Sequence, residues 1–215
     1  GKTFLGRVYL VAAGKAAWQM AHAARACLQD NFCGGVVVTK YGHVKGEIAN
    51  VACFEGGHPV PDENSLRGTD AALALTEDLT ESDTVVFLLS GGGSALFEKP
   101  LLPLAELQDV TNQFLAAGAD IVEINTIRKR LSAVKGGRFA RHCAPAQVFA
   151  VVLSDILGDP LDMIASGPAY PDSSSCAQAL DIAKRYGLRL SERAWALLAQ
   201  ETPKTLENVE TQITG

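Results

Sequence analysis

The segment 84–89, Thr-Val-Val-Phe-Leu-Leu, constrains the fold of this chain more than any other stretch. It has no polar interruption, as expected of a central strand that is covered on both faces of a parallel sheet. The strand ends abruptly at 90–94, where three glycines stand between two serines. A strand buried in this way needs neighbouring strands and covering helices, which favours an α/β architecture.

Strand-like and helix-like segments alternate along the rest of the chain. Runs rich in β-branched residues predict further strands at 7–12, 35–39, 50–55 and 147–153. Apolar residues spaced three or four apart predict helices at 15–28, 64–79, 103–117, 121–132, 176–186 and 191–201. The alternation predicts a doubly wound, Rossmann-like α/β fold, with a mainly parallel sheet flanked by helices. Function is then expected in the loops that follow the carboxyl ends of the strands.

The composition fits one large domain, or at most two small ones, in 215 residues of which 47% are apolar. With 19 basic and 24 acidic side chains the net charge is −5, which argues against nucleic-acid and membrane partners. No apolar run approaches the roughly 20 residues of a membrane helix. Five cysteines without a Cys-x-x-Cys pair suit neither a disulfide framework nor a cysteine zinc site, and they predict a cytoplasmic location.

The strongest chemical signal is the loop after strand 84–89, Ser90-Gly91-Gly92-Gly93-Ser94. Consecutive backbone N–H groups without side chains above them can form a concave nest for a phosphate or a carboxylate. A tight turn that needs glycine dihedrals and binds nothing explains the same residues. The loop is not a Walker motif, because Lys99 follows Glu98 where that motif has a glycine.

Two further candidates lie in loops at other strand ends. Lys15 follows Gly14, where the first strand turns into its helix, and could point into an anionic site or into solvent. His58 stands before a proline in the loop that follows strand 50–55, and it is either structural or catalytic.

The C-terminal half of the chain offers another group of polar candidates. Asp155 and Asp159 lie four residues apart beyond strand 147–153, an arrangement suited to Mg²⁺, to accepting a proton or to helix capping. Asn125, Arg128 and Lys135 could supply donors from one side of a helix and its following turn, or form a solvated basic face.

A dinucleotide-binding fingerprint is absent from the sequence. The first strand is followed by Ala-Ala-Gly-Lys instead of Gly-x-Gly-x-x-Gly, and no acidic residue closes the second strand at Thr39-Lys40. The sequence therefore argues against a nicotinamide cofactor.

Seven short motifs occur in one order across nearly all of the chain: 14–17, 57–65, 89–96, 125–132, 134–138, 153–159 and 164–168. As an ordered set they resemble the bacterial and animal glycerate 2-kinase family, whose members carry a leucine-rich C-terminal domain and are often labelled hydroxypyruvate reductases. The resemblance implies ATP-dependent phosphorylation of the C2 hydroxyl of D-glycerate to 2-phosphoglycerate, with Mg²⁺. The active site would lie in a cleft between this domain and a second one.

The resemblance also assigns expected roles to the candidate residues. Lys15 matches the family's active-site lysine, and we expect it to be catalytic together with Asp155. We expect substrate or phosphate contacts from the loop Ser90 to Ser94 and from Asn125, Arg128 and Lys135. Asp155 and Asp159 are the expected metal ligands.

The family's enzymes are longer than this chain. Residues 1–215 are therefore expected to be a truncated N-terminal domain without its C-terminal domain, with little activity alone and a tendency to form a homo-oligomer. Two alternatives stay open: an NAD(P)H-dependent hydroxypyruvate reductase, and a non-catalytic anion-binding domain. For the kinase and for the reductase, the expected partner is a small-molecule substrate.

Overall fold

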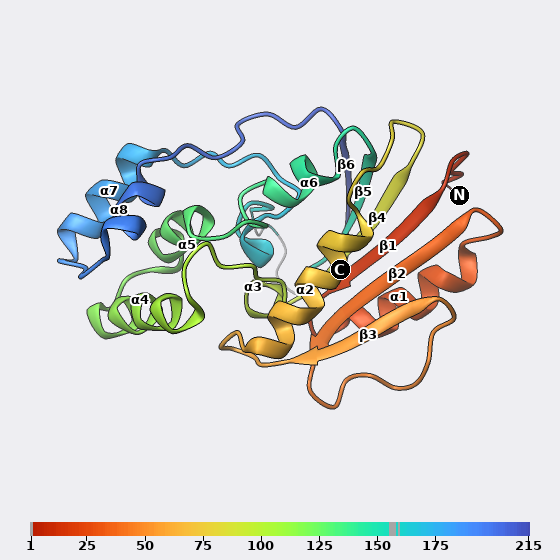
Figure 1. The fold of residues 1–215 in the computed structure, drawn as a ribbon, viewed down its shortest axis with the longest axis horizontal. Coiled ribbons are helices and arrows are strands. Elements are labelled where there is room, and N and C mark those ends of the chain that lie inside the picture. Colours follow the sequence, from red (N-terminus) through yellow and green to blue (C-terminus); the bar gives the residue numbers. More distant parts are fainter. Residues whose placement is uncertain (1, 155–157, 159) are drawn as a thin grey trace.

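A computed structural model describes residues 2–154, 158 and 160–215 as a sheet with helices on both faces (Figure 1). Six strands run parallel in the spatial order β3-β2-β1-β4-β5-β6. They are β1 (Val8–Ala13), β2 (Phe32–Lys40), β3 (Val51–Gly56), β4 (Thr84–Leu89), β5 (Gln147–Leu153) and β6 (Val209–Thr214). The predicted doubly wound α/β fold is confirmed.

Eight α-helices and one 3₁₀ helix are found in the described residues. They are α1 (Ala17–Cys27), α2 (Glu63–Leu75), α3 (Gly93–Leu96), α4 (Leu104–Ala117), α5 (Ile121–Arg130), α6 (Arg138–Cys143), α7 (Cys176–Arg185), α8 (Glu192–Leu198) and η1 (Ile164–Ser166). Side-chain caps fix four of the starts, because Asp62, Asp120, Ser175 and Ser191 accept hydrogen bonds from backbone N–H groups of α2, α5, α7 and α8.

Strand β6, the short helices α3 and α6 and the 3₁₀ helix η1 were not predicted. Strand β6 alternates polar and apolar residues and is mostly exposed at the sheet edge, so it lacks the apolar run that marks a buried strand. Helices α3 and α6 have only four and six residues and begin after glycines in the left-handed conformation, Gly92 and Gly137. In the sequence such segments resemble loops.

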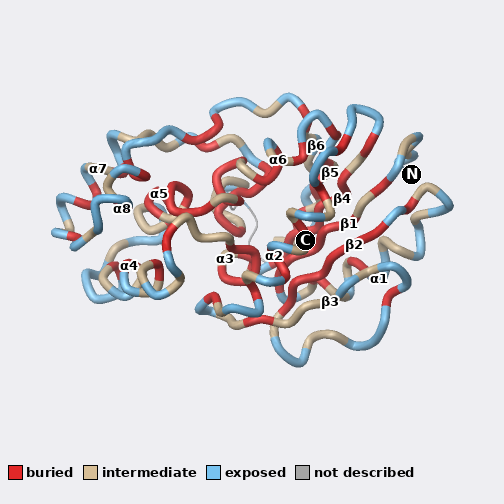
Figure 2. The backbone as a smooth tube through the Cα atoms, viewed as in Figure 1, coloured by how far each residue is buried: buried red, intermediate tan, exposed pale blue. Residues whose placement is uncertain are grey.

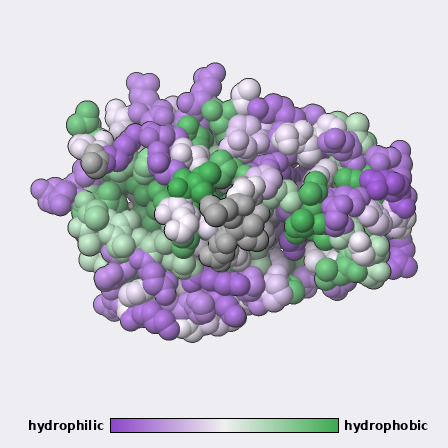
Figure 3. Space-filling model, turned by 180° about the vertical axis from the view of Figure 1, so that it is seen from behind, coloured by the Kyte–Doolittle hydropathy of each residue, from purple (hydrophilic) through white to green (hydrophobic). Residues whose placement is uncertain are grey.

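Strands β1, β2 and β4 consist mainly of buried residues (Figure 2). Side chains of the strands contribute to two separate hydrophobic cores. Helix α1 covers one face, where Ala17 and Ala21 pack against Leu10 and Val37. Helices α2, α3 and α6 cover the other face, where Phe97 and Phe139 pack around Phe87 of β4, with ring centroids 4.7–5.4 Å apart. The reverse side of the molecule, seen in Figure 3, presents apolar surface between hydrophilic borders.

Helices α4, α5, α7 and α8 gather beside the sheet and have a core of their own (Figure 1). Phe114 of α4, Ile127 of α5 and Ile182 of α7 belong to this core. Helix α5 also contacts η1, which in turn contacts α3. The helical cluster is thereby joined to the carboxyl edge of the sheet, where the candidate residues lie.

The chain reverses its direction of winding between β1 and β4. Strand β1 leads through α1 to β2 on one side, and β4 pairs with β1 on the other side. The loops that follow β1 and β4 consequently lie next to each other at the carboxyl edge of the sheet, where ligands bind in such folds. No helix among the residues described is both long enough and apolar enough to cross a lipid bilayer.

Candidate active site

Hydrogen bonds join the loop after β1 to the loop after β4. The backbone N–H of Lys15 donates to the carbonyl oxygen of Gly91 at 2.8 Å, and that of Ala16 donates to Ser90 Oγ at 3.1 Å. Gly14 has φ +124°, and a Cβ at this position would lie 2.2 Å from Ser90 Oγ. Only glycine permits both this conformation and this close approach.

The triple-glycine loop presents free backbone donors. The N–H groups of Gly91, Gly92 and Ser94 donate no hydrogen bond to any residue that the structure describes. Gly92 has φ +85°, and a Cβ there would lie 2.9 Å from His58 Cδ2 and 3.2 Å from Lys15 Cγ. The loop, Lys15 and His58 are therefore brought together, and the predicted anion nest has the open donors that it needs.

Lys15 borders this loop and Lys40 lies near His58, and neither lysine has an acidic partner in the part of the chain that the structure describes. Among the described residues, no ion pair or side-chain hydrogen bond involves the ammonium group of Lys15 or of Lys40. Burial lowers the pKa of His58 below its ordinary value, and the charges of Lys15 and Lys40 lower it further. The neutral imidazole and the two cations form an electropositive site suited to a polyanion.

Lys40 is a site residue that the sequence pattern alone does not mark. It is the last residue of β2, and β2 pairs with β1, so Lys40 reaches the same edge as Lys15. The sequence feature that could have pointed to Lys40 is its position at the end of a strand, but many surface lysines share that position.

The backbone of Lys15 is held from the side of β2. The buried hydroxyl of Thr39 donates to the carbonyl oxygen of Gly14 at 2.8 Å. His43 Nδ1 lies 3.0 Å from the carbonyl oxygen of Lys15. In the tautomer with a proton on Nδ1, the ring donates a hydrogen bond to this oxygen. These bonds fix the direction in which the Lys15 side chain leaves the sheet.

Lys135 reaches the loop from beneath. Its side chain is fully buried, and Nζ donates to the carbonyl oxygens of Ser94 at 2.7 Å and Phe97 at 3.2 Å. Glu98 lies 3.7 Å from the ammonium group. Burial lowers the pKa of Lys135 to about 8. The structure thus offers Lys135 as a support for the loop, with its donors directed to backbone carbonyls.

Asn125 is linked to the loop through η1. Ser166 Oγ donates to Asn125 Oδ1 at 2.6 Å and lies 3.5 Å from Ser94 Oγ. The amide nitrogen of Asn125 lies 3.6 Å from the sulfur of Met163. Asn125 is buried and has its acceptor and donor occupied within the protein.

Helix η1 has a strained backbone where it meets the loop. Ala165, Ser166 and Gly167 are consecutive and have φ of 53°, 61° and 59°. Left-handed conformations at non-glycine residues cost energy and are concentrated at functional sites. The methyl group of Ala165 occupies the space beside Gly93, where a Cβ would lie only 2.7 Å away.

Arg128 lies one turn after Asn125 on α5 but faces a separate recess with Pro59 and Gln108 among its walls. Asp155 and Asp159 lie outside the described residues, so their predicted roles stay predictions. No group of three or more His, Cys, Asp or Glu side chains in the described ranges could hold a metal ion.

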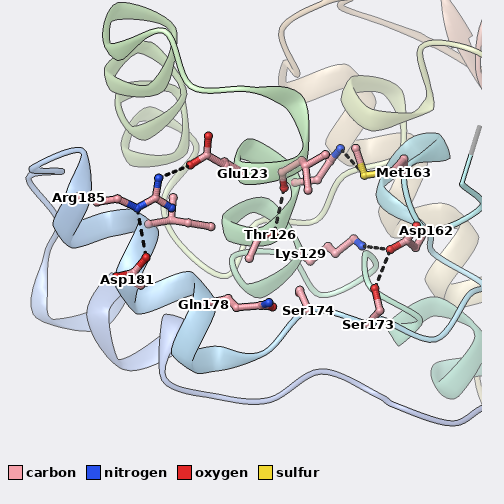
Figure 4. A pocket seen from close by; sticks show the side chains of 13 residues that line it. Glu123, Thr126, Lys129, Asp162, Met163, Ser173, Ser174, Gln178, Asp181 and Arg185 are labelled. Carbon is pink, nitrogen blue, oxygen red and sulfur yellow. Dashed lines mark hydrogen bonds and ion pairs between the residues drawn. The ribbon is translucent and has the colours of Figure 1, made fainter.

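A further cavity of about 320 Å³ lies between α5, α7 and the segments at 162–163 and 173–174 (Figure 4). Its cations have carboxylate partners: Lys129 lies 3.4 Å from Asp162, and Arg185 pairs with Glu123 and Asp181. Lys15 and Lys40 have no such partner among the residues described, so the strand-end site is the better anion site.

The geometry defines a doubly wound α/β domain with an electropositive candidate site where its winding reverses. The chain belongs to the family described as Domain of unknown function (DUF4147), whose model matches residues 2–199.

Relatives with kinase names are similar to nearly the whole chain. A D-glycerate 2-kinase of Thermotoga maritima is 56% identical over 216 residues, covering 100% of this chain and 52% of the relative. A glycerate 2-kinase of Pyrococcus horikoshii is 43% identical, covering 87% of this chain and 43% of the relative. A relative from Agrobacterium vitis, 43% identical, has the provisional name hydroxypyruvate reductase. The chain thus spans about half the length of the curated relatives it matches.

Two crystal structures are similar to the chain. A glycerate kinase of Thermotoga maritima, 56% identical, superposes with a TM-score of 0.94 over 97% of this chain and 51% of that one. A Pyrococcus horikoshii protein, 38% identical, gives a TM-score of 0.91 over 99% and 50% of the two chains.

Proposed function

We propose that this chain forms the N-terminal domain of an ATP-dependent kinase that phosphorylates the C2 hydroxyl of D-glycerate. The observation that supports it best is the unpaired ammonium group of Lys15 beside the open amides of Gly91, Gly92 and Ser94, within the part of the chain that the structure describes. The names of the Thermotoga and Pyrococcus relatives supply the substrate class. A kinase needs a site of this kind, because phosphoryl transfer depends on positioning and charge neutralisation.

In the proposed reaction, the C2 hydroxyl oxygen forms a bond to the γ-phosphorus of ATP. The bond from that phosphorus to the bridging oxygen breaks, the hydroxyl proton leaves, and ADP and 2-phosphoglycerate are the products. Lys15 would neutralise charge on the transferring group, and the loop amides would donate to its oxygens. Lys135 and Asn125 would hold the loop in position from below and from the side.

Magnesium belongs to the proposal through Asp155 and Asp159. Carboxylate oxygens suit Mg²⁺, but both residues lie outside the described ranges, and the remaining residues offer no cluster that replaces them. The metal would supply charge neutralisation at the phosphates. Asp155 stays the proposed proton acceptor, and His58, uncharged near pH 7, is a second group with that capacity.

The second wall of the active site is also part of the proposal. The relatives are about twice as long as this chain, which is why we assign the remainder of the cleft to a further domain. A cytoplasmic location is proposed from five cysteines that are all free thiols. Association into a homo-oligomer is retained as a prediction.

A coupled assay tests the activity on the protein in its full natural length. With ATP, Mg²⁺ and D-glycerate, ADP should form, and the product should be 2-phosphoglycerate, identified by its conversion by enolase. The same protein with NADH and hydroxypyruvate should show no loss of nicotinamide absorbance. NADH oxidation without ADP release would favour the reductase. If neither reaction occurs, a non-catalytic anion-binding domain would be favoured.

A further inference from the structure

A recess of about 230 Å³ lies between the segment that follows His58 and helix α4. Pro59, Val60 and Leu107 give it apolar walls, and Gln108 and Asn112 add amide side chains. Arg128 of α5 contributes its one charged group. Drug-sized ligands occupy pockets of about 300–1,000 Å³, so this recess suits a smaller molecule.

The guanidinium group of Arg128 has no partner within the described part of the chain. No hydrogen bond or ion pair involves it, although burial lowers its pKa and only the charge of Glu98 opposes that effect. Glu98 itself accepts from the backbone of Lys99 and faces Lys135. Nearby Arg130 is different, because its guanidinium donates to Thr126 and to Ser174. A shielded cation without a partner is costly unless a ligand supplies the anion.

The recess adjoins the electropositive site at the strand ends. Pro59 directly follows His58, whose ring borders Gly92. On the other side, Asn125 precedes Arg128 by one helical turn and is connected to Ser94 through Ser166. A small molecule bound to Arg128 would therefore have its other end near the loop and Lys15.

The chemistry of the two sites differs. Lys15 stands beside several free amides and Lys40 adds a positive charge near His58, which together suit the several negative charges of a polyphosphate. Arg128 offers one planar fork of donors between apolar walls, which matches one carboxylate with a short carbon chain.

We propose that Arg128 binds the carboxylate of the acceptor substrate in this recess and thereby selects small 2-hydroxy acids over neutral polyols. This assignment rests on the proposed kinase function and divides its site into two. The phosphoryl donor occupies the side of Lys15 and Lys40, and the acid occupies the side of Arg128.

Arg128→Gln in the full-length protein tests the assignment, with Arg128→Lys as a conservative variant. We expect Arg128→Gln to raise the KM for D-glycerate at least tenfold while the KM for ATP changes less than twofold. The preference for D-glycerate over its neutral amide, D-glyceramide, should fall at least tenfold. The KM of Arg128→Lys for D-glycerate should lie between those of Arg128→Gln and wild type, since lysine keeps the positive charge but lacks the paired donors of the guanidinium group. Arg141→Gln removes an exposed charge elsewhere and should change none of these constants.

A second variant covers the case in which Arg128→Gln does not fold. Val60 is half exposed at the mouth of the recess, so Val60→Trp should obstruct it without touching the guanidinium. It should also raise the KM for D-glycerate selectively. An unchanged KM in both variants, or a raised KM for ATP alone, would overturn the assignment.

Direct binding separates this inference from the proposed function. If the wild-type protein forms no ADP from D-glycerate, the kinase proposal fails. Isothermal titration with D-lactate and D-glycerate then still decides: binding to wild type that Arg128→Gln abolishes supports the carboxylate site. Equal binding by both proteins, or binding by neither, overturns it.

Discussion

The ammonium group of Lys135 donates a 2.7 Å hydrogen bond to the carbonyl oxygen of Ser94, at the end of the triple-glycine loop. A second bond reaches the carbonyl oxygen of Phe97. A fully buried cation is thereby used to fix backbone geometry. Since both carbonyls belong to the short α3 segment and its cap, Lys135 holds the loop in the shape that leaves its amides free.

This burial predicts a pH dependence of stability. The pKa of Lys135 is lowered by burial to about 8, against 10.5 in the unfolded chain. Between pH 8 and 10.5 the unfolded state binds more protons, so the contribution of Lys135 to the free energy of unfolding rises with pH, by about 1 kcal/mol per unit. Urea denaturation at about pH 7.5, 8.5 and 9.5 measures it.

The comparison protein for this experiment is Lys135→Met. The free energy of unfolding of the wild type minus that of Lys135→Met should increase with pH across that window. The exposed lysine variant Lys184→Met should follow the wild-type pH curve. Parallel curves for wild type and Lys135→Met would contradict the lowered pKa.

Lys15→Ala should lower phosphorylation of D-glycerate by about 10²-fold or more, because loss of one positioned donor to a developing oxyanion costs about 2.7–4 kcal/mol. The exposed Lys15 ammonium group has no partner in the described protein, so the melting temperature should barely change. Steady-state kinetics beside thermal melting checks both statements.

Lys45→Ala is the control for this variant. Lys45 is exposed in the loop after β2 and donates to the carbonyl oxygen of Gly42. It should keep wild-type turnover. Wild-type turnover in Lys15→Ala would contradict the catalytic role and show that Lys15 is an ordinary surface lysine.

Gly92→Val should weaken binding of ADP at least tenfold. The new side chain would need φ +85° and would lie against His58 and Lys15, covering the loop amides. Gly118→Val is a matched control, because Gly118 has φ +69° at the end of α4 and a Cβ there would meet no atom within 4 Å. Both variants should lose stability in thermal melts because both need a positive φ, while calorimetric titration shows a loss of affinity only for Gly92→Val. Equal affinities would make the triple glycine a structural turn.

The sequence predicts the strands and the site loops because both depend on local patterns. An uninterrupted apolar run marks β4, and glycines mark the turns that follow β1 and β4. Their approach follows from strand order, since β1 and β4 are neighbours. Any doubly wound sheet would bring two such loops together at the point where the winding reverses.

The depth of individual side chains is set by packing between distant segments. Lys135 stands in a Lys-Gly-Gly turn, which suggests exposure, yet α3 packs over it and buries it completely. Lys40 gains its role only because β2 lies next to β1. The left-handed backbone at Ala165 and Ser166 has no signature in the sequence, because neither residue is glycine.

Anion binding should raise the pKa of His58. In the free protein, burial and the charges of Lys15 and Lys40 lower it, so the ring is neutral near pH 7. Pyrophosphate bound beside the ring would favour the imidazolium form and move the titration to higher pH. Proton NMR of the His58 ring, titrated with and without pyrophosphate, follows this change directly. Removing a cation by Lys40→Ala should raise the pKa of His58 in the free protein and reduce the further increase on adding pyrophosphate. If the pKa of His58 is the same with and without pyrophosphate, the anion binds elsewhere, and the proposed phosphate site at this edge of the sheet is wrong.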